Sequence, residues 1–134
     1  MNVADVMDEL GDALDTISGL RVFPYWVDKV SPPAAIVGFP EELTYDATYG
    51  RGSDSITLPI IVVVGRVNAR STRDRVAQYT DGTGMTSAKT AIESHSATSY
   101  DRARVVRVEF GTASIGGTEY LAATFHVDIT GSGA

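Results

Sequence analysis

The chain has 134 residues, which is enough for one compact domain with a buried core, and we expect a single α/β domain over residues 1–134. A hydrophobic content of 43% with 21% charged residues argues against wholesale disorder, and the absence of cysteine excludes disulfides and thiolate metal sites. The net charge of −6 argues against a protein that grips nucleic-acid phosphates, because such proteins usually present a basic surface.

The first segment predicts an amphipathic helix over residues 3–17, followed by Gly19 as a stop signal. Its apolar side chains recur at helical spacing: Val3, Val6, Met7, Leu10, Leu14 and Ile17. The gaps are filled by acids: Asp5, Asp8, Glu9, Asp12 and Asp15. Such a face is usually a solvated surface. The alternative is a negative stripe that lines a channel or meets a basic partner.

Four strands are expected next, over residues 21–27, 34–39, 43–49 and 55–66. Pro24 cannot donate a hydrogen bond to a neighbouring strand, which favours an edge position or a bulge for the first strand. Residues 50–54 are glycine-rich and predict a loop between the third and fourth strands. The fourth strand is polar on one face at its start and apolar on both faces at its end. We therefore expect a helix layer or a subunit contact to cover that end.

Two short helices are predicted over residues 72–79 and 87–93, separated by a break at 81–84. Ser71 and Asp74 have the spacing of a capping box, in which a serine side chain caps the first turn. The pair Gly82 and Gly84 lacks the further glycine and the preceding strand of a phosphate-binding loop, so a turn between helices is the better interpretation.

The C-terminal part predicts a β-hairpin of two long strands around Gly116–Gly117. A two-residue turn places Ile115 opposite Thr118 and fixes the register of the pairs that follow. The apolar pairs are then Phe110 with Ala123, Val108 with Phe125, and Val106 with Val127, all on one face. The opposite face pairs Glu109 with Thr124 and Arg107 with His126. Residues 130–134 are expected to fray.

No catalytic constellation emerges from the residues, and we predict neither an enzyme nor a cofactor or metal site. The two histidines, His95 and His126, stand at no metal-binding spacing, and no serine stands in a nucleophile elbow. Aromatic and charged side chains near strand ends are the better candidates, because aromatics are enriched at protein interfaces. The candidate interface residues are Tyr45, Tyr49, Arg51, Asp54, Arg107 and His126. Core packing remains the alternative for both tyrosines.

The start of the chain lacks the basic region and apolar run of a signal peptide. The longest apolar run, residues 60–64, is far shorter than the ~20 residues that cross a bilayer. The expectation is a cytoplasmic protein without a membrane partner.

The order of elements resembles the tail-terminator proteins of long-tailed, siphovirus-type phages, the lambda-like tail-terminator family, and especially those of phages that infect actinobacteria. Three segments carry the resemblance: the acidic opening helix over 3–17, the paired helices from 74–79 through 87–93, and the ending over 116–127. The resemblance covers nearly the whole chain and rests on layout and composition.

The predicted elements themselves indicate an α+β fold: a mixed, mostly antiparallel sheet packed by the N-terminal amphipathic helix and two short helices, ending in the long hairpin. The resemblance implies a ring, usually a hexamer, that caps the head-proximal end of the tail tube, stops its polymerisation and offers a docking surface for the head-completion protein. DNA would pass through the lumen without specific binding. The protein would belong to the virion and assemble in the host cytoplasm.

Three other functions stay open at this point. The nearest is another neck or head-to-tail completion protein, or the tail tube protein itself, which would share the size and acidic balance. A small binding module without a phage role is the second, and an enzyme is the third.

Overall fold

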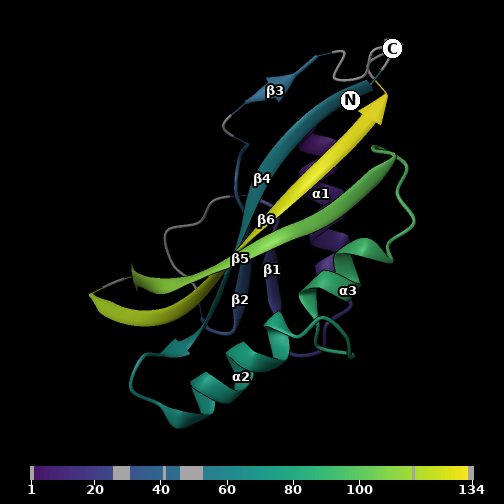
Figure 1. Cartoon of the computed structure of the whole chain (residues 1–134). Coiled ribbons are helices and arrows are strands. Elements are labelled where there is room, and N and C mark those ends of the chain that lie inside the picture. Colours follow the sequence, from purple (N-terminus) through teal and green to yellow (C-terminus); the bar gives the residue numbers. More distant parts are fainter. Residues whose placement is uncertain (1, 26–30, 41, 46–52, 116, 133–134) are drawn as a thin grey trace.

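The computed structural model describes residues 2–25, 31–40, 42–45, 53–115 and 117–132, which form an α+β fold of three helices and a six-stranded mixed sheet. The helices are α1 (Val3–Leu14), α2 (Arg70–Thr80) and α3 (Ala88–Glu93). The strands are β1 (Arg21–Phe23), β2 (Ala34–Val37), β3 (Leu43–Thr44), β4 (Ser53–Arg66), β5 (Arg102–Ile115) and β6 (Thr118–Ser132). Figure 1 shows their arrangement, in which β4, β6 and β5 form a long, twisted central sheet.

The strands follow the order β1-β2-β4-β6-β5, and β3 also pairs with β4. Pairing is antiparallel except between β1 and β2. The edge position expected for the first strand is confirmed, since β1 lies at one end of the sheet and β5 at the other. Gly117 adopts a φ of 83° in the turn between β5 and β6, a conformation that glycine adopts readily.

The register predicted for the C-terminal hairpin is confirmed from the turn back to Arg107. Ile115 pairs with Thr118, Val108 pairs with Phe125, and Arg107 pairs with His126. The pair predicted between Val106 and Val127 is wrong, because the register shifts between Val105 and Arg107 and places Val105 opposite Val127. The irregularity inserts one extra residue, so that Val105 is 8% exposed and Val106 is 40% exposed.

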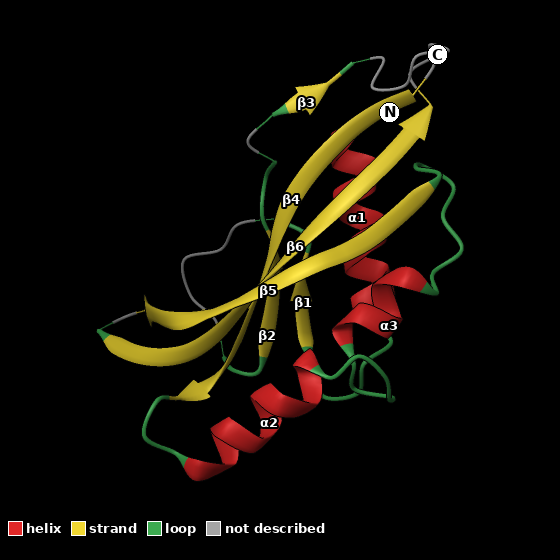
Figure 2. Ribbon diagram, viewed as in Figure 1, coloured by secondary structure: helices red, strands yellow, loops and turns green. Residues whose placement is uncertain are grey.

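One face of the sheet packs against the helices and forms the core. Apolar side chains alternate along β4 and β6 toward this face, and α1, α2 and α3 contribute their buried sides to the same cluster. Figure 2 shows the helices beside the sheet, with α1 crossing behind its long strands. Phe125 is the largest fully buried side chain at its centre, with 0% exposure.

The opposite face of the sheet is buried only near the end of β4. Ala34, Ile36, Val63 and Ala122 are buried there, although they lie outside the main core cluster. Both faces of this strand are therefore buried at its end, and the helices pack on the core face. The chain provides that burial by itself, so a subunit contact is not needed to explain it.

The helix boundaries differ from the sequence-based prediction at several ends. The Asn2 side chain caps α1, which ends at Leu14, earlier than the predicted end at Ile17, and Gly19 follows with a φ of 81°. Ser87 caps α3 by accepting a hydrogen bond from the Thr90 N–H at 3.2 Å. The predicted capping box is wrong, because α2 begins at Arg70, so Ser71 lies inside the helix and Ala69 at its N-cap has no side-chain oxygen.

The C-terminal residues also differ from expectation. Residues 130–132 do not fray: β6 continues to Ser132, and Thr130, Gly131 and Ser132 pair with the first three residues of β4. Only residues 133–134 of the predicted tail lie outside the described residues. No helix within the described part of the chain is long and apolar enough to cross a membrane.

Candidate interface along strand β5

Strand β5 forms one end of the sheet, so only one of its two edges is paired. β6 occupies the inner edge, and the outer edge, here named the β5 edge, has no strand partner among the residues that the structure describes. At 14 residues it spans roughly 46 Å. An open edge of this length presents unpaired backbone N–H and C=O groups, which can bind another chain.

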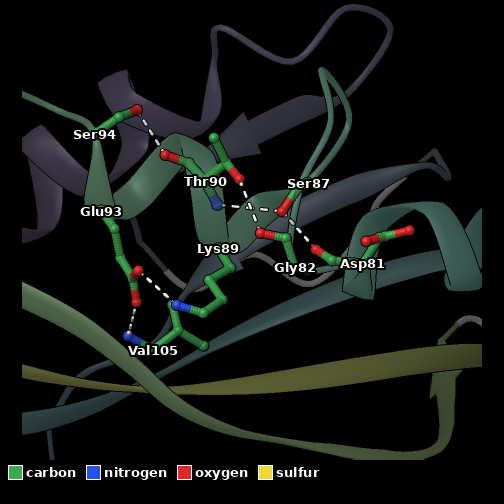
Figure 3. Close-up of polar contacts among 8 residues, drawn as sticks. All are labelled: Asp81, Gly82, Ser87, Lys89, Thr90, Glu93, Ser94 and Val105. Atoms are coloured by element: carbon green, nitrogen blue, oxygen red, sulfur yellow. Dashed lines mark hydrogen bonds and ion pairs between the residues drawn. The ribbon is translucent and has the colours of Figure 1, made fainter.

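Glu93 covers one position of the β5 edge. Its carboxylate accepts a hydrogen bond from the Val105 backbone N–H at 3.0 Å and another from the Lys89 ammonium group (Figure 3). Burial acts to raise the pKa of Glu93, but these two hydrogen bonds and the charges of Lys89 and Arg104 together hold that pKa below its ordinary value. The carboxylate therefore stays charged at neutral pH and remains a strong acceptor for the edge amide.

The preceding turn positions α3 so that Glu93 reaches the strand. The Ser87 hydroxyl donates to the Asp81 carbonyl oxygen at 2.5 Å, and the Thr90 hydroxyl donates to the Gly82 carbonyl oxygen at 3.2 Å (Figure 3). These bonds hold the segment between α2 and α3 against the first turn of α3. The glycine pair that the sequence assigned to a helix-to-helix turn lies in this segment, between the two helices.

The side chains of β5 that point away from the helices are largely charged. Arg102, Arg104 and Arg107 are exposed on this face. The Glu109 carboxylate lies 3.3 Å from Arg107 Nε and 2.9 Å from Nε2 of His126 on the neighbouring strand. The predicted neighbours Arg107 and His126 are thus confirmed as opposite residues, and Glu109 contacts both.

Two apolar side chains of β5 are also exposed. Phe110 is 62% exposed, and Val106, at the bulge, is 40% exposed. Phe110 pairs with the fully buried Ala123 and so points toward the helix side of the sheet, yet no helix covers it. Aromatic side chains are enriched at protein interfaces, so Phe110 is a candidate contact for another protein.

A hollow of about 340 Å³ lies between α3, the segment that follows it and the start of β5. Its polar lining includes Lys89, Glu93, His95, Tyr100, Arg102 and Arg104. Tyr100 is 5% exposed, and its hydroxyl is buried without a hydrogen-bond partner in the described part of the chain. Burial, followed by the nearby negative charge of Glu9, raises the pKa of Tyr100 to about 12.

Glu9 differs from the other acids of α1. Its carboxylate accepts hydrogen bonds from the backbone N–H groups of Thr98 and Ser99 at 3.0 Å each, and from the Thr98 hydroxyl. Burial raises its pKa, but these hydrogen bonds outweigh burial and leave the pKa below its ordinary value. The sequence grouped Glu9 with the solvated acidic face. It instead joins α1 to the segment before β5, and His95 Nε2 lies 3.6 Å from the same carboxylate.

The structure does not bring all six predicted interface residues together. Arg107 and His126 are neighbours, whereas Tyr45 is 72% exposed at the end of β3, away from them in the strand order. Asp54 lies in β4, opposite Gly131, and is 5% exposed, so it does not belong to an exposed loop as predicted. Tyr49 and Arg51 lie outside the described residues.

Sequence reasoning missed Glu93, Tyr100 and Phe110. Alternation placed Phe110 on the core face, and its side chain does point to that face. It is nevertheless exposed, because no helix covers the sheet at that position. Nothing local marks Glu93 as a partner of β5. Within the described residues no group of His, Asp and Glu side chains could hold a metal ion.

Comparison with known proteins gave no match, either to a family model or to a curated protein.

Proposed function

We propose that this protein is a phage tail terminator, a subunit that forms a ring, caps the head-proximal end of the tail tube and stops its polymerisation. The observation that carries the proposal is the open β5 edge, with exposed arginines and an exposed Phe110, on an acidic domain whose residues suggest no catalytic site. The order of elements that resembles the terminator family supports it as well.

The mechanism of such a protein is steric and requires no covalent chemistry. A closed ring requires two different patches on each subunit to meet around an axis. One face of the ring would reproduce the contacts by which tube rings stack, and the other would recruit no further tube ring and would receive the head-completion protein. The net charge of −6 suits a ring through which DNA passes without specific binding, since an acidic surface repels phosphates.

A second candidate is another neck protein or the tube protein itself. The long, open-edged strand supports this candidate as much as the tail terminator, because stacked tube subunits also need extended contacts. The two differ in what the purified protein does. A tube protein forms filaments, whereas a terminator stops at a ring or remains a monomer until it meets the tube.

Deleting the gene from its phage and imaging the particles by negative-stain electron microscopy tests the proposal. Overlong tails without heads are expected, because nothing ends the tube, and normal-length tails would overturn the proposal. Complementation with the wild-type gene is the control and should restore uniform tails. Light scattering and images of the pure protein address the second candidate, since long tubes from the protein alone would favour the tube protein.

A further inference from the structure

We infer that the β5 edge binds the acidic face of α1 from a second copy of this chain, in a head-to-tail contact. This inference deepens the proposed function. It rests on that function at one point, because a ring needs two unlike patches on each subunit. The occupant is chosen by charge complementarity: the chain carries an acidic ridge on one helix and a row of arginines on one strand.

The acidic ridge consists of Asp5, Asp8, Asp12 and Asp15, which are exposed along one face of α1 and its C-terminal cap. None of the four forms an ion pair with any residue that the structure describes. Like charges three and four residues apart destabilise a helix, and acids near its C-terminus oppose the helix dipole. The last turn of α1 holds no basic residue, so a cationic partner would relieve both effects.

The β5 edge offers the matching cations. Arg102, Arg104 and Arg107 are exposed on β5, and the first two also line the hollow beside α3. Tyr100 lines the same hollow, and its buried hydroxyl lacks a hydrogen-bond partner among the described residues. A carboxylate entering this hollow would meet the guanidinium groups of Arg102 and Arg104, beside the Glu93 and Asp101 carboxylates that also line it. Guanidinium groups bind carboxylates strongly.

The two rows of charge have similar lengths. Ten residues of α-helix separate Asp5 from Asp15, which is about 15 Å. Five residues of strand separate Arg102 from Arg107, which is about 16 Å. One helix can therefore lie along the strand with several carboxylates facing guanidinium groups at once, while Val106 at the bulge becomes partly covered beside them.

Within one chain, the described residues form no ion pair between this acidic ridge and the β5 arginines. α1 packs on the helix side of the sheet, whereas Arg107 leaves β5 on the opposite side, where its Nε lies 3.3 Å from Glu109. Each copy thus presents both halves of the contact on different sides. Such heterologous patches produce a ring when the rotation closes and a filament when it does not.

Charge-reversal variants of the full chain test the contact. Variant A carries Asp8→Lys and Asp12→Lys, and variant B carries Arg104→Glu and Arg107→Glu. Each alone should lose self-association, with a dissociation constant raised roughly a hundredfold or more, because like charges then face each other across the contact. An equal mixture should restore association, since an alternating A–B arrangement pairs opposite charges at every contact. Arg70→Glu with Arg73→Glu, the same charge change on α2, is the matched control and should associate like the wild type.

Cysteine pairs give a second measurement, because the natural chain contains no cysteine. A chain with both Asp12→Cys and Arg104→Cys should form a ladder of disulfide-linked oligomers on oxidation, and each single-cysteine chain should stop at a linked dimer. A ladder and rescue by mixing support the inference. Unchanged association of variants A and B, failure of the mixture, or the absence of a ladder from the double-cysteine chain would overturn it. Tail length in the phage reports separately on the terminator role, since copies can associate through this contact whether or not they cap a tube.

Discussion

The Glu93 carboxylate accepts a hydrogen bond from the Val105 backbone N–H at 3.0 Å, and so occupies a position on the β5 edge that a neighbouring strand would otherwise fill. In the same strand, the Val105 side chain is buried in the core and the Val106 side chain is exposed. The outer edge of β5 is therefore covered at Val105 by a side chain of the same chain. Past the bulge, β6 occupies the inner edge and no strand lies along the outer edge within the described residues.

Replacing Glu93 with alanine is expected to lower the free energy of unfolding by about 1–2 kcal/mol, because the Val105 amide loses its acceptor. Urea denaturation followed by circular dichroism measures the change. Glu119→Ala, which removes the same charge from an exposed position on β6, is the control and should be nearly neutral. Equal losses for the two variants would contradict a structural role for the Glu93 contact.

Glu9 should make the free energy of unfolding depend on pH in the acidic range. Its pKa is lower in the folded chain than its ordinary value of 4.5, because the hydrogen bonds from Thr98 and Ser99 outweigh burial. Its contribution is therefore complete above that ordinary value and is lost as the pH falls through the lower, folded-state pKa. In Glu9→Gln the fall in unfolding free energy between neutral and acidic pH should be smaller.

Hydrogen exchange gives a local measurement of the same contact. The Thr98 and Ser99 amides donate to Glu9, so their protection should drop in Glu9→Gln and in the wild type at low pH. Asp12→Asn is the matched control, since Asp12 lies exposed on the same helix and forms no ion pair with the described residues. Unchanged protection of these two amides in Glu9→Gln would contradict the contact between Glu9 and the segment before β5.

The bulge in β5 can be tested by paired substitutions. Val105→Asp should cost about 3 kcal/mol or more, because it places a carboxylate in the core, whereas Val106→Asp should be nearly neutral. Thermal unfolding of both variants measures the difference. The regular register expected from the turn predicts the reverse order, so a larger loss for Val106→Asp would show that the bulge is misplaced.

Gly65 is expected to resist substitution because α2 approaches it closely. A Cβ there would lie 2.6 Å from the Thr72 Oγ1, and Thr72 is 3% exposed, so it has little room to move. Gly65→Ala should therefore cost about 1–3 kcal/mol. Adding Thr72→Ala should recover part of that loss, a coupling that a double-mutant cycle measures. Simple additivity of the two losses would rule out the clash.

Several features follow from the sequence because local periodicity encodes them. The spacing of Val6, Leu10 and Leu14 determines the buried side of α1, and the turn at Gly116–Gly117 together with alternation determines the hairpin register as far as Arg107. The helix predicted over residues 87–93 is α3, with Ser87 at its N-cap. In each case the interacting residues lie within a few positions of one another, or are related by one short turn.

The candidate interface depended on tertiary structure instead. Glu9 meets Thr98 and Ser99 across 89 and 90 positions of sequence, and Ser132 is ordered by pairing with Ser53, so neither contact has a local signal. The exposure of Phe110 depends on where the helices stop covering the sheet, which the alternation of β5 cannot encode. The sequence by itself thus determined which way the side chains of β5 point from Arg107 to the turn, and the bulge reverses the direction expected for the residues before it. Only the packing of distant elements decided that the outer edge of β5 stays open, because burial depends on what lies opposite a residue and periodicity records only its direction.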